Sequence, residues 1–267
     1  NNNILSELTM SGMATTSINV VENSFYIGQN IASGDSVIIS YNNDILNRIQ
    51  INGGGRGEFI PELKNTRIDS NVIYKSNLID YYVQNEETFL LNNAVVNYQN
   101  TILKADHIHV DWKTSLLYAK QKNNEYPSVK TGSEKPIIGE NFKFDLTTKH
   151  GVINKGKTSL NDSYYHGSKI YRDEPNLIHV NNSIYTSCDL DDPHYYLFSK
   201  KMKMIPEDRI IARPLWLYIY DIPIIGVPLA IFPNKGGDRR SGWIMPSFGS
   251  DARRGTFFRH LGYYWAP

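Results

Sequence analysis

The sequence predicts an all-β protein, and three observations lead to this prediction. β-Branched and aromatic residues are frequent, with 18 Tyr and 10 Phe among 267 residues, and such residues are enriched in strands. Apolar and polar residues alternate in short runs, which are separated by turn-forming Asn, Gly and Ser. Pro214, Pro223, Pro228 and Pro233 interrupt one long apolar run, and each removes a backbone donor and disfavours helix at the preceding residue.

The first predicted strands lie in residues 17–62 and read SINVV, SFYIG, DSVIISY and ILNRIQI. Asn, Gly and Ser separate them, as expected for turns. A glycine-rich run at residues 53–57 follows the last of these strands. No Gly-Lys-Ser/Thr follows, and Glu58 to Pro61 do not start a helix, so we interpret the run as a bulge or turn and not as a phosphate loop.

Five regularly spaced strands are predicted between residues 71 and 119, reading VIYKS, LIDYYVQ, TFLLNNAVVNYQ, TILKADHIHVDW and SLLYAKQ. Such repetition is typical of a strand meander or a stacked jellyroll. Residues 121–135 are polar and are predicted to form a loop. Strands resume at Asn141 and continue to about Pro233.

The most apolar part of the chain is residues 209–249, in which Pro214, Pro223, Pro228 and Pro233 recur. Prolines at this spacing argue against a membrane-spanning helix. A basic turn at residues 235–240 follows. Residues 241–265 are then predicted to form a hairpin of two strands, each of roughly nine or ten residues, which is close to the length that a tilted strand needs to cross a bilayer.

Composition narrows the functional classes. The net charge is +1, and basic residues are interspersed with acidic ones, so no nucleic-acid footprint is present. The single cysteine, Cys188, cannot form a disulfide within the chain, and it does not decide the compartment. Because the sequence starts and stops within strand-like patterns, we expect it to be a piece of a longer protein.

Two arrangements of metal-ligand residues occur. His107 and His109 would point the same way in a strand, near Asp106 and Asp111, but no third ligand is fixed by spacing. The turn at residues 189–194 holds three Asp and one His, but it lacks the glycine-centred loop and distal Glu of an EF-hand. We therefore predict no metal and no cofactor.

Residues for nucleophilic catalysis are equally sparse. Cys188 could pair with His194 or His179, but the local signatures of cysteine hydrolases are missing. No Gly-x-Ser-x-Gly elbow is present either. We predict that the chain is not an enzyme.

Several predicted strands carry one apolar face. Taken alone, these faces are explained by a closed β core, with an open apolar surface as the alternative. The residues concerned are Leu91, Val96, Tyr98, Ile108, Val110, Trp112, Phe142, Phe144, Val152 and Ile184.

Four segments resemble a known family in combination and in order. They read IYTSCDLDDPHYYL, IPIIGVPLAIFP, DRRSGWIMPSFG and LGYYWAP, within residues 184–267. Together they are similar to the junction of the outer-membrane lipopolysaccharide assembly proteins of the LptD family. Upstream, residues 89–119 resemble the OstA pattern of an apolar strand followed by an Ala-Asp step, here Ala105 and Asp106.

The resemblance implies a fold and a function. Residues 1–233 would form a periplasmic OstA-type β-jellyroll of open, twisted, stacked strands, and residues 234–267 a linker turn and the first strands of a truncated outer-membrane β-barrel. The jellyroll groove, lined by the ten apolar residues above, would shield the acyl chains of lipid A during lipopolysaccharide transport. Pro246 and Gly262 would lie at the barrel gate, and Cys188 would pair with a cysteine outside the chain.

The resemblance also implies partners and a location. These are lipopolysaccharide, an LptA-like periplasmic bridge docked on the N-terminal strands, an LptE-like lipoprotein and the Gram-negative outer membrane, with this region mainly in the periplasm. Two other classes stay open: a soluble OstA/LptA-like bridge without a barrel, and a β-solenoid enzyme that acts on polysaccharide.

Overall fold

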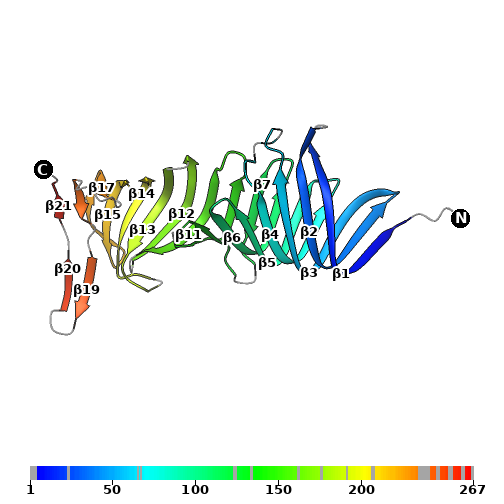
Figure 1. Ribbon diagram of the computed structural model, residues 1–267. Coiled ribbons are helices and arrows are strands. Elements are labelled where there is room, and N and C mark those ends of the chain that lie inside the picture. The colour runs from blue at the N-terminus through cyan, green and yellow to red at the C-terminus, as the bar shows by residue number, and fades with distance from the viewer. Residues whose placement is uncertain are drawn as a thin grey trace. The chain divides into compact units, whose positions relative to one another are not determined.

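The computed structural model consists of β-strands joined by turns (Figure 1). It describes residues 5–265, apart from residues 23–24, 65, 67, 123–124, 133–134, 161–162, 175–176, 191, 206–207, 234–240, 245–246, 252–254 and 260–261. Within the described residues, no helix is long and apolar enough to cross a membrane. The chain forms two compact units, residues 1–149 and residues 150–267. The predicted all-β class is confirmed.

The first unit is an antiparallel meander in which most strands pair with the next one in sequence. The first half of β6, Thr101 to Lys104, pairs with β8, whereas its second half pairs with β7. β7 in turn pairs with β10. Its strands are β1 (Glu7–Glu22), β2 (Phe25–Asn42), β3 (Ile45–Pro61), β4 (Val72–Tyr82), β5 (Glu87–Tyr98), β6 (Thr101–Asp111), β7 (Leu116–Lys120), β8 (Ser128–Thr131), β9 (Ile137–Ile138) and β10 (Asn141–Asp145).

A line of register shifts crosses the middle of the first five strands, and we call it the bulge column. The shifts lie between Ser11 and Ala14, Ser33 and Ser36, Asn52 and Gly55, Lys75 and Leu78, and Leu91 and Ala94. In alternate strands two residues here have positive φ, such as Gly53 (79°) and Gly54 (64°) in β3. Glycine reaches this region without a Cβ clash. Because a bulge bends its strand, the aligned bulges bend the sheet along one line.

The bulge column explains why the strands are longer than predicted. β2 has 18 residues, although its sequence reads as two short strands on either side of Gly34 and Asp35. β3 likewise continues through residues 53–57 to Pro61, so the glycine run is a bulge inside a strand and does not end it. The predicted loop at residues 121–135 also contains the short strand β8.

The core of the first unit is built from rows of apolar residues that face each other across the ladders. One row runs without interruption from β2 to β7, and each of its members is at most 2% exposed. It consists of Val37, Ile51, Ile79, Leu90, Ile108 and Ala119. The burial of these side chains removes apolar surface from water, which is the main force that holds the sheet in its bent form.

The second unit continues the antiparallel pattern, with neighbouring strands paired from β11 to β15. β15 pairs with β17 along its first half and with β16 along its second half. The strands are β11 (Gly151–Leu160), β12 (Ser163–Glu174), β13 (Leu177–Thr186), β14 (Tyr195–Ile205), β15 (Arg209–Ile219), β16 (Ile222–Val227) and β17 (Ala230–Pro233).

A line of missing residue pairs crosses the second unit. In each ladder one pair of opposite residues is unpaired, and the register is the same on both sides of it. We call this line the gap column; its members are Lys155, Ser168, Asn182, Lys200 and Pro214. Buried serines beside it bind the backbone groups that the ladders leave free. Ser199 Oγ accepts from the Arg213 N–H (3.1 Å) and donates to the Lys201 carbonyl (3.0 Å), and Ser183 Oγ donates to the Ser199 carbonyl (3.1 Å).

The last four strands pair as two short antiparallel ladders. β18 (Gly242–Ile244) pairs with β21 (Gly262–Tyr264), and β19 (Ser247–Asp251) pairs with β20 (Gly255–Arg259). The two ladders share one register, since a step of five residues from Gly242 to Ser247 moves the partner five residues, from Tyr264 to Arg259. The hairpin predicted over residues 241–265 is therefore present.

Candidate functional site

Six of the ten predicted groove residues are buried on the inward face of the first unit. Val96, Tyr98, Ile108, Val110, Trp112 and Phe142 are at most 6% exposed. Ile108 belongs to the row described above, and Val110 lies in the adjacent row opposite Thr88 and Leu117. Val96 and Tyr98 lie beyond the bulge column, opposite Tyr74 and Val72. The inward face thus has two halves, one on each side of the bend.

The other four predicted residues are only half-buried. Phe144 pairs with Leu117 in the row of Val110, so it lies at the margin of the inward face. Leu91 lies on the opposite face, and Leu90 takes the inward position.

In the second unit, too, the neighbour of each predicted residue takes the inward position. Val152 pairs with Tyr171, whereas its neighbour Ile153 pairs with Ile170, which packs on the core cluster. Ile184 is only half-buried, and Tyr185 beside it is buried. These corrections share one physical cause: where two adjacent residues are both apolar or aromatic, alternation does not decide which of them points inward.

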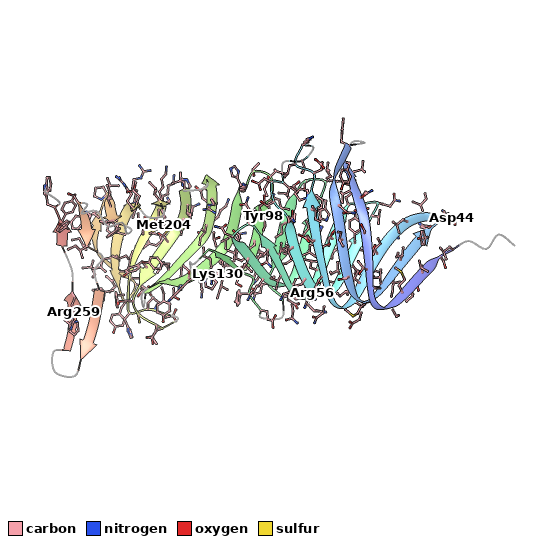
Figure 2. All side chains as sticks on the ribbon, viewed as in Figure 1. Asp44, Arg56, Tyr98, Lys130, Met204 and Arg259 are labelled. Carbon is pink, nitrogen blue, oxygen red and sulfur yellow. The ribbon has the colours of Figure 1, made fainter. Side chains whose placement is uncertain are left out.

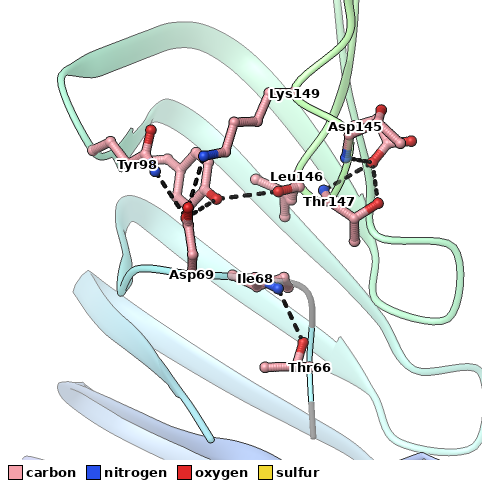
Figure 3. Close-up of polar contacts among 10 residues, drawn as sticks. Thr66, Ile68, Asp69, Tyr98, Asp145, Leu146, Thr147 and Lys149 are labelled. Atoms are coloured by element: carbon pink, nitrogen blue, oxygen red, sulfur yellow. Dashed lines mark hydrogen bonds and ion pairs between the residues drawn. The ribbon is translucent and has the colours of Figure 1, made fainter. Parts of the chain in front are cut away.

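Tyr98 is held by a polar cluster that the sequence did not reveal (Figure 3). The Asp69 carboxylate accepts hydrogen bonds from Tyr98 Oη (2.8 Å), Gln99 Nε2 (2.8 Å) and Lys149 Nζ (2.7 Å). Tyr98 Oη also lies 3.1 Å from the Leu146 carbonyl. Tyr98 ends β5 (Figure 2), so this Asp69 cluster ties β5 to the β3–β4 connection and to the turn after β10.

The Asp69 cluster shifts the pKa of both acidic groups. The Lys149 ammonium and then the Tyr98 hydroxyl lower the pKa of Asp69 from 3.8 to about 2. Burial and then the Asp69 carboxylate raise the pKa of the Tyr98 hydroxyl well above its ordinary value. The Tyr98 hydroxyl therefore keeps its proton and donates a hydrogen bond to Asp69. This bond fixes the Tyr98 ring on the inward face.

Two further buried aromatic residues have polar anchors. Trp112 Nε1 donates to Thr88 Oγ1 (2.8 Å), and Tyr74 Oη donates to Asn30 Oδ1 (2.6 Å). The Trp112 ring also packs on Phe59, with ring centroids 5.0 Å apart. Because these polar atoms are paired, the inward face presents hydrocarbon with few free polar groups.

The two histidines that were weighed as metal ligands lie on the outer face. His107 Nδ1 is 2.9 Å from the Asp106 carboxylate, and its Nε2 is 2.7 Å from Lys122 Nζ. His109 stacks between Phe89 and Tyr118, with ring centroids 4.4 and 5.8 Å away. Its Nε2 lies 3.3 Å from Glu87. Among the described residues, no group of three or more His, Cys, Asp or Glu could hold a metal.

The other predicted sites lie in the second unit. Cys188 Sγ is 3.9 Å from His194 Nδ1, and its backbone N–H donates to Thr186 Oγ1 (3.0 Å). Gly262 pairs with Ile244. Pro246 and Asp191 lie outside the described residues.

The inward face of the second unit becomes uncovered toward β16. Leu197 on β14 is 8% exposed and Leu217 on β15 is half-buried, but Ile225, which pairs with Leu217, is 61% exposed. Ile222 pairs with Ile219 and is 62% exposed. This end of the inward face therefore presents exposed apolar surface.

Comparison with known proteins finds similarity to one family. Residues 210–267, from β15 to β21, match the family described as LptD protein. The chain is also 26% identical over 175 residues to the LPS-assembly protein LptD of Bordetella avium and 27% identical over 168 residues to that of Acinetobacter baumannii. These matches make the chain similar to the LptD family, whose model covers its last 58 residues. The two alignments cover 63% and 61% of this chain.

The chain spans about a fifth of the length of these LptD relatives, 21% and 20%. Among solved structures, LptH of Pseudomonas aeruginosa, titled an LptA-homologous periplasmic component of the lipopolysaccharide transport device, matches with a TM-score of 0.32 and 12% identity. That match covers 44% of this chain and 84% of LptH. The part of this chain that matches the LptD family model includes β16, β17 and the hairpin strands β18 to β21.

Proposed function

We propose that this chain is the jellyroll and first barrel hairpin of a non-enzymatic conduit for lipopolysaccharide. Residues 1–233 form the periplasmic jellyroll, and residues 234–267 lead into an outer-membrane barrel. The observation that carries the proposal is the apolar inward face, which is buried along β2 to β7 in the first unit and is uncovered at Ile222 and Ile225 in the second unit. The naming of the relatives as LPS-assembly proteins supports the choice of ligand.

The inward face matches the chemistry of lipid A acyl chains. Water exposure of hydrocarbon costs about 0.8 kcal/mol per methylene group, so a path of apolar side chains lowers the free energy of the chains in transit. Val96, Tyr98, Ile108, Val110, Trp112, Phe142 and Phe144 contribute to this path in the first unit, together with Leu90. Phosphates and sugars remain in water, where they keep their hydration.

The proposal includes partners and a place in the cell. An LptA-like bridge docks on the N-terminal strands and delivers lipopolysaccharide, and an LptE-like lipoprotein occupies the complete barrel in the Gram-negative outer membrane. Cys188 forms a disulfide with a cysteine beyond this chain. Pro246 and Gly262 weaken the first barrel strands beside the exit for lipid.

Photo-crosslinking tests the lipid path. A photoreactive residue at Val110 or Ile225 should capture lipopolysaccharide, because both positions are on the inward face. His109 and Ile73 are matched outward controls; Ile73 is apolar and 49% exposed, so hydrophobicity alone would label it as well. Equal capture at all four positions, or capture at none in folded protein, would contradict the proposal.

A further inference from the structure

Basic side chains gather on the outer face of the second unit beside the gap column. Lys169, Lys200, Lys201 and Arg213 are exposed, and Lys201 lies directly opposite Arg213 across the β14–β15 ladder. Among the described residues, none of the four forms an ion pair. Like charges in opposite positions destabilise an antiparallel pair, so an external anion would relieve this repulsion.

The strand segments around these cations contain no carboxylate. Residues 165–171, 179–185, 197–203 and 211–216 lie on four successive strands and include no Asp or Glu. Asp221, in the β15–β16 turn, has a carboxylate that accepts a hydrogen bond from Tyr196 Oη (2.9 Å), and Asp208 pairs with Arg209 at the start of β15 (2.8 Å). Positive charge therefore lies beside the gap column, and a carboxylate lies near each end of β15.

Aromatic side chains occupy the outer face between these two ends. Phe198 pairs with Trp216, and Tyr196 pairs with Tyr218, with the two tyrosine rings stacked at 5.0 Å between centroids. Trp216 is 39% exposed, and its ring covers Gly226, where a Cβ would lie 2.5 Å from Trp216 Cε3. The glycine thus lets the indole ring lie against β16 with one side toward solvent.

The cations and the exposed aromatic rings of this face each match groups at a bilayer surface. Trp and Tyr favour the interface because their rings are apolar and their polar ends stay hydrated. Lys and Arg are attracted to anionic head groups. The exposed indole of Trp216 beside the cations adds an apolar contact of the kind that the interfacial layer of a bilayer accepts.

The connection to the hairpin supports the same occupant. The hairpin that begins at β18 belongs to the same unit as β15. In this hairpin the ring of Tyr263 contacts the rings of Trp243 and Trp265, with centroids 5.6 and 6.4 Å apart. Trp243, Tyr263 and Trp265 are 37%, 49% and 76% exposed. Exposed aromatic residues flank the apolar band of membrane strands.

We propose that the outer face of β14 and β15, with Lys200, Lys201, Arg213 and Trp216 at its centre, docks on a bilayer surface that contains anionic phospholipid. The contact orients the second unit on the membrane. It goes beyond lipid transport, because it uses the face opposite the proposed lipid path.

Vesicle sedimentation of the 267-residue chain tests the docking surface. The chain should bind mixed vesicles of phosphatidylcholine and phosphatidylglycerol more tightly than vesicles of phosphatidylcholine alone. Binding to phosphatidylcholine alone measures the contribution of the apolar hairpin. The triple change Lys200→Gln, Lys201→Gln and Arg213→Gln should lower binding to the mixed vesicles by about a hundredfold, from the loss of three basic groups near an anionic surface.

Matched control variants separate the effect of this docking surface from the effect of a lower net charge. The triple change Lys104→Gln, Lys120→Gln and Lys130→Gln removes three exposed cations from the first unit and should retain most of the binding. Trp216→Ala should weaken binding, whereas Tyr126→Ala, at a 51% exposed ring, should not.

Equal affinity for the two kinds of vesicle, or equal losses in the two triple variants, would overturn the proposal. Lipopolysaccharide capture at Val110, measured in the same variants, separates the two proposals. Capture that persists while vesicle binding falls supports docking as an independent property. Absent capture with intact vesicle binding would count against the lipid path alone.

Discussion

Buried aromatic residues with polar ends show how single side chains define the inward face. Tyr98, Trp112 and Tyr74 each bring one polar atom into the core, and each finds a partner from a distant part of the chain. A buried polar group without a partner costs about 1–3 kcal/mol. The burial of Tyr98 and Trp112 was predictable from their strands, but Asp69 and Thr88 carry no local signal for this role.

The Asp69 cluster gives a prediction of pH dependence. The pKa of Asp69 is about 2 in the folded chain against an ordinary 3.8. Its contribution to stability is therefore complete above pH 3.8 and is lost as the pH falls toward 2. Asp69→Asn should lower the free energy of unfolding at pH 7 by less than about 1 kcal/mol, since the carboxylate is about half exposed and screened.

Urea unfolding at several pH values checks this prediction. The difference between the original chain and Asp69→Asn should shrink between pH 4 and pH 2, because Asp69 itself becomes protonated there. A difference that stays constant down to pH 2 would show that the carboxylate charge does not stabilise the cluster.

At the scale of elements, the irregular positions within the strands shape the sheet as much as the regular strands do. The bulge column and the gap column divide long strands into two halves, and the residues there have turn-like sequences: Gly12-Met13, Gly53-Gly54 and Asn92-Asn93 all have positive φ. Asn, like Gly, tolerates this region. The sequence pattern marked the glycine run at residues 53–57 as a bulge or turn, but it predicted one unbroken strand through Asn92-Asn93.

Ser199 provides a test of the gap column. Its side chain is almost fully buried, and it binds both the Arg213 N–H and the Lys201 carbonyl. Ser199→Ala leaves both backbone groups without this partner and should lower the free energy of unfolding by about 1–3 kcal/mol. Ser168→Ala is the control, because Ser168 is exposed and water replaces its hydroxyl; about 0.5 kcal/mol is expected.

Denaturant midpoints of the two serine variants, measured with an unchanged slope, give these differences. Similar losses for Ser168→Ala and Ser199→Ala would mean that the buried hydroxyl is not what holds the strands together at the gap column.

At the scale of the whole molecule, the second unit joins a jellyroll-like sheet to a hairpin in one continuous run. β17 ends at Pro233 and β18 begins at Gly242. The hairpin holds its register from Gly242 to Asp251. Apolar inward surface is uncovered at β16, and β17 separates β16 from the hairpin in the chain. This succession suits the exit of the proposed lipid conduit.

Pro246 is the basis of a prediction for a longer protein that carries the complete barrel. A proline cannot donate to a strand ladder, so Pro246→Ala should strengthen the first barrel strand and slow the delivery of lipopolysaccharide to the cell surface. Ile244→Ala is the control, since it shortens a side chain and leaves the backbone donors unchanged. Surface labelling of lipopolysaccharide measures delivery, and normal delivery in Pro246→Ala would remove Pro246 from the gate.

The sequence by itself determined the all-β class, the strand meander, the hairpin at the C-terminus and the LptD resemblance. These follow from local alternation, turn residues and motifs, which need no knowledge of distant contacts. Only the tertiary structure decided which residue of each apolar doublet faces inward. Leu90 lies inward in place of Leu91, Ile153 in place of Val152, and Tyr185 in place of Ile184, because alternation cannot separate two adjacent apolar residues and only the pairing of the strands sets which one faces the core. The same holds for the Asp69 cluster and the cationic and aromatic outer face, whose members come together only through pairing between strands.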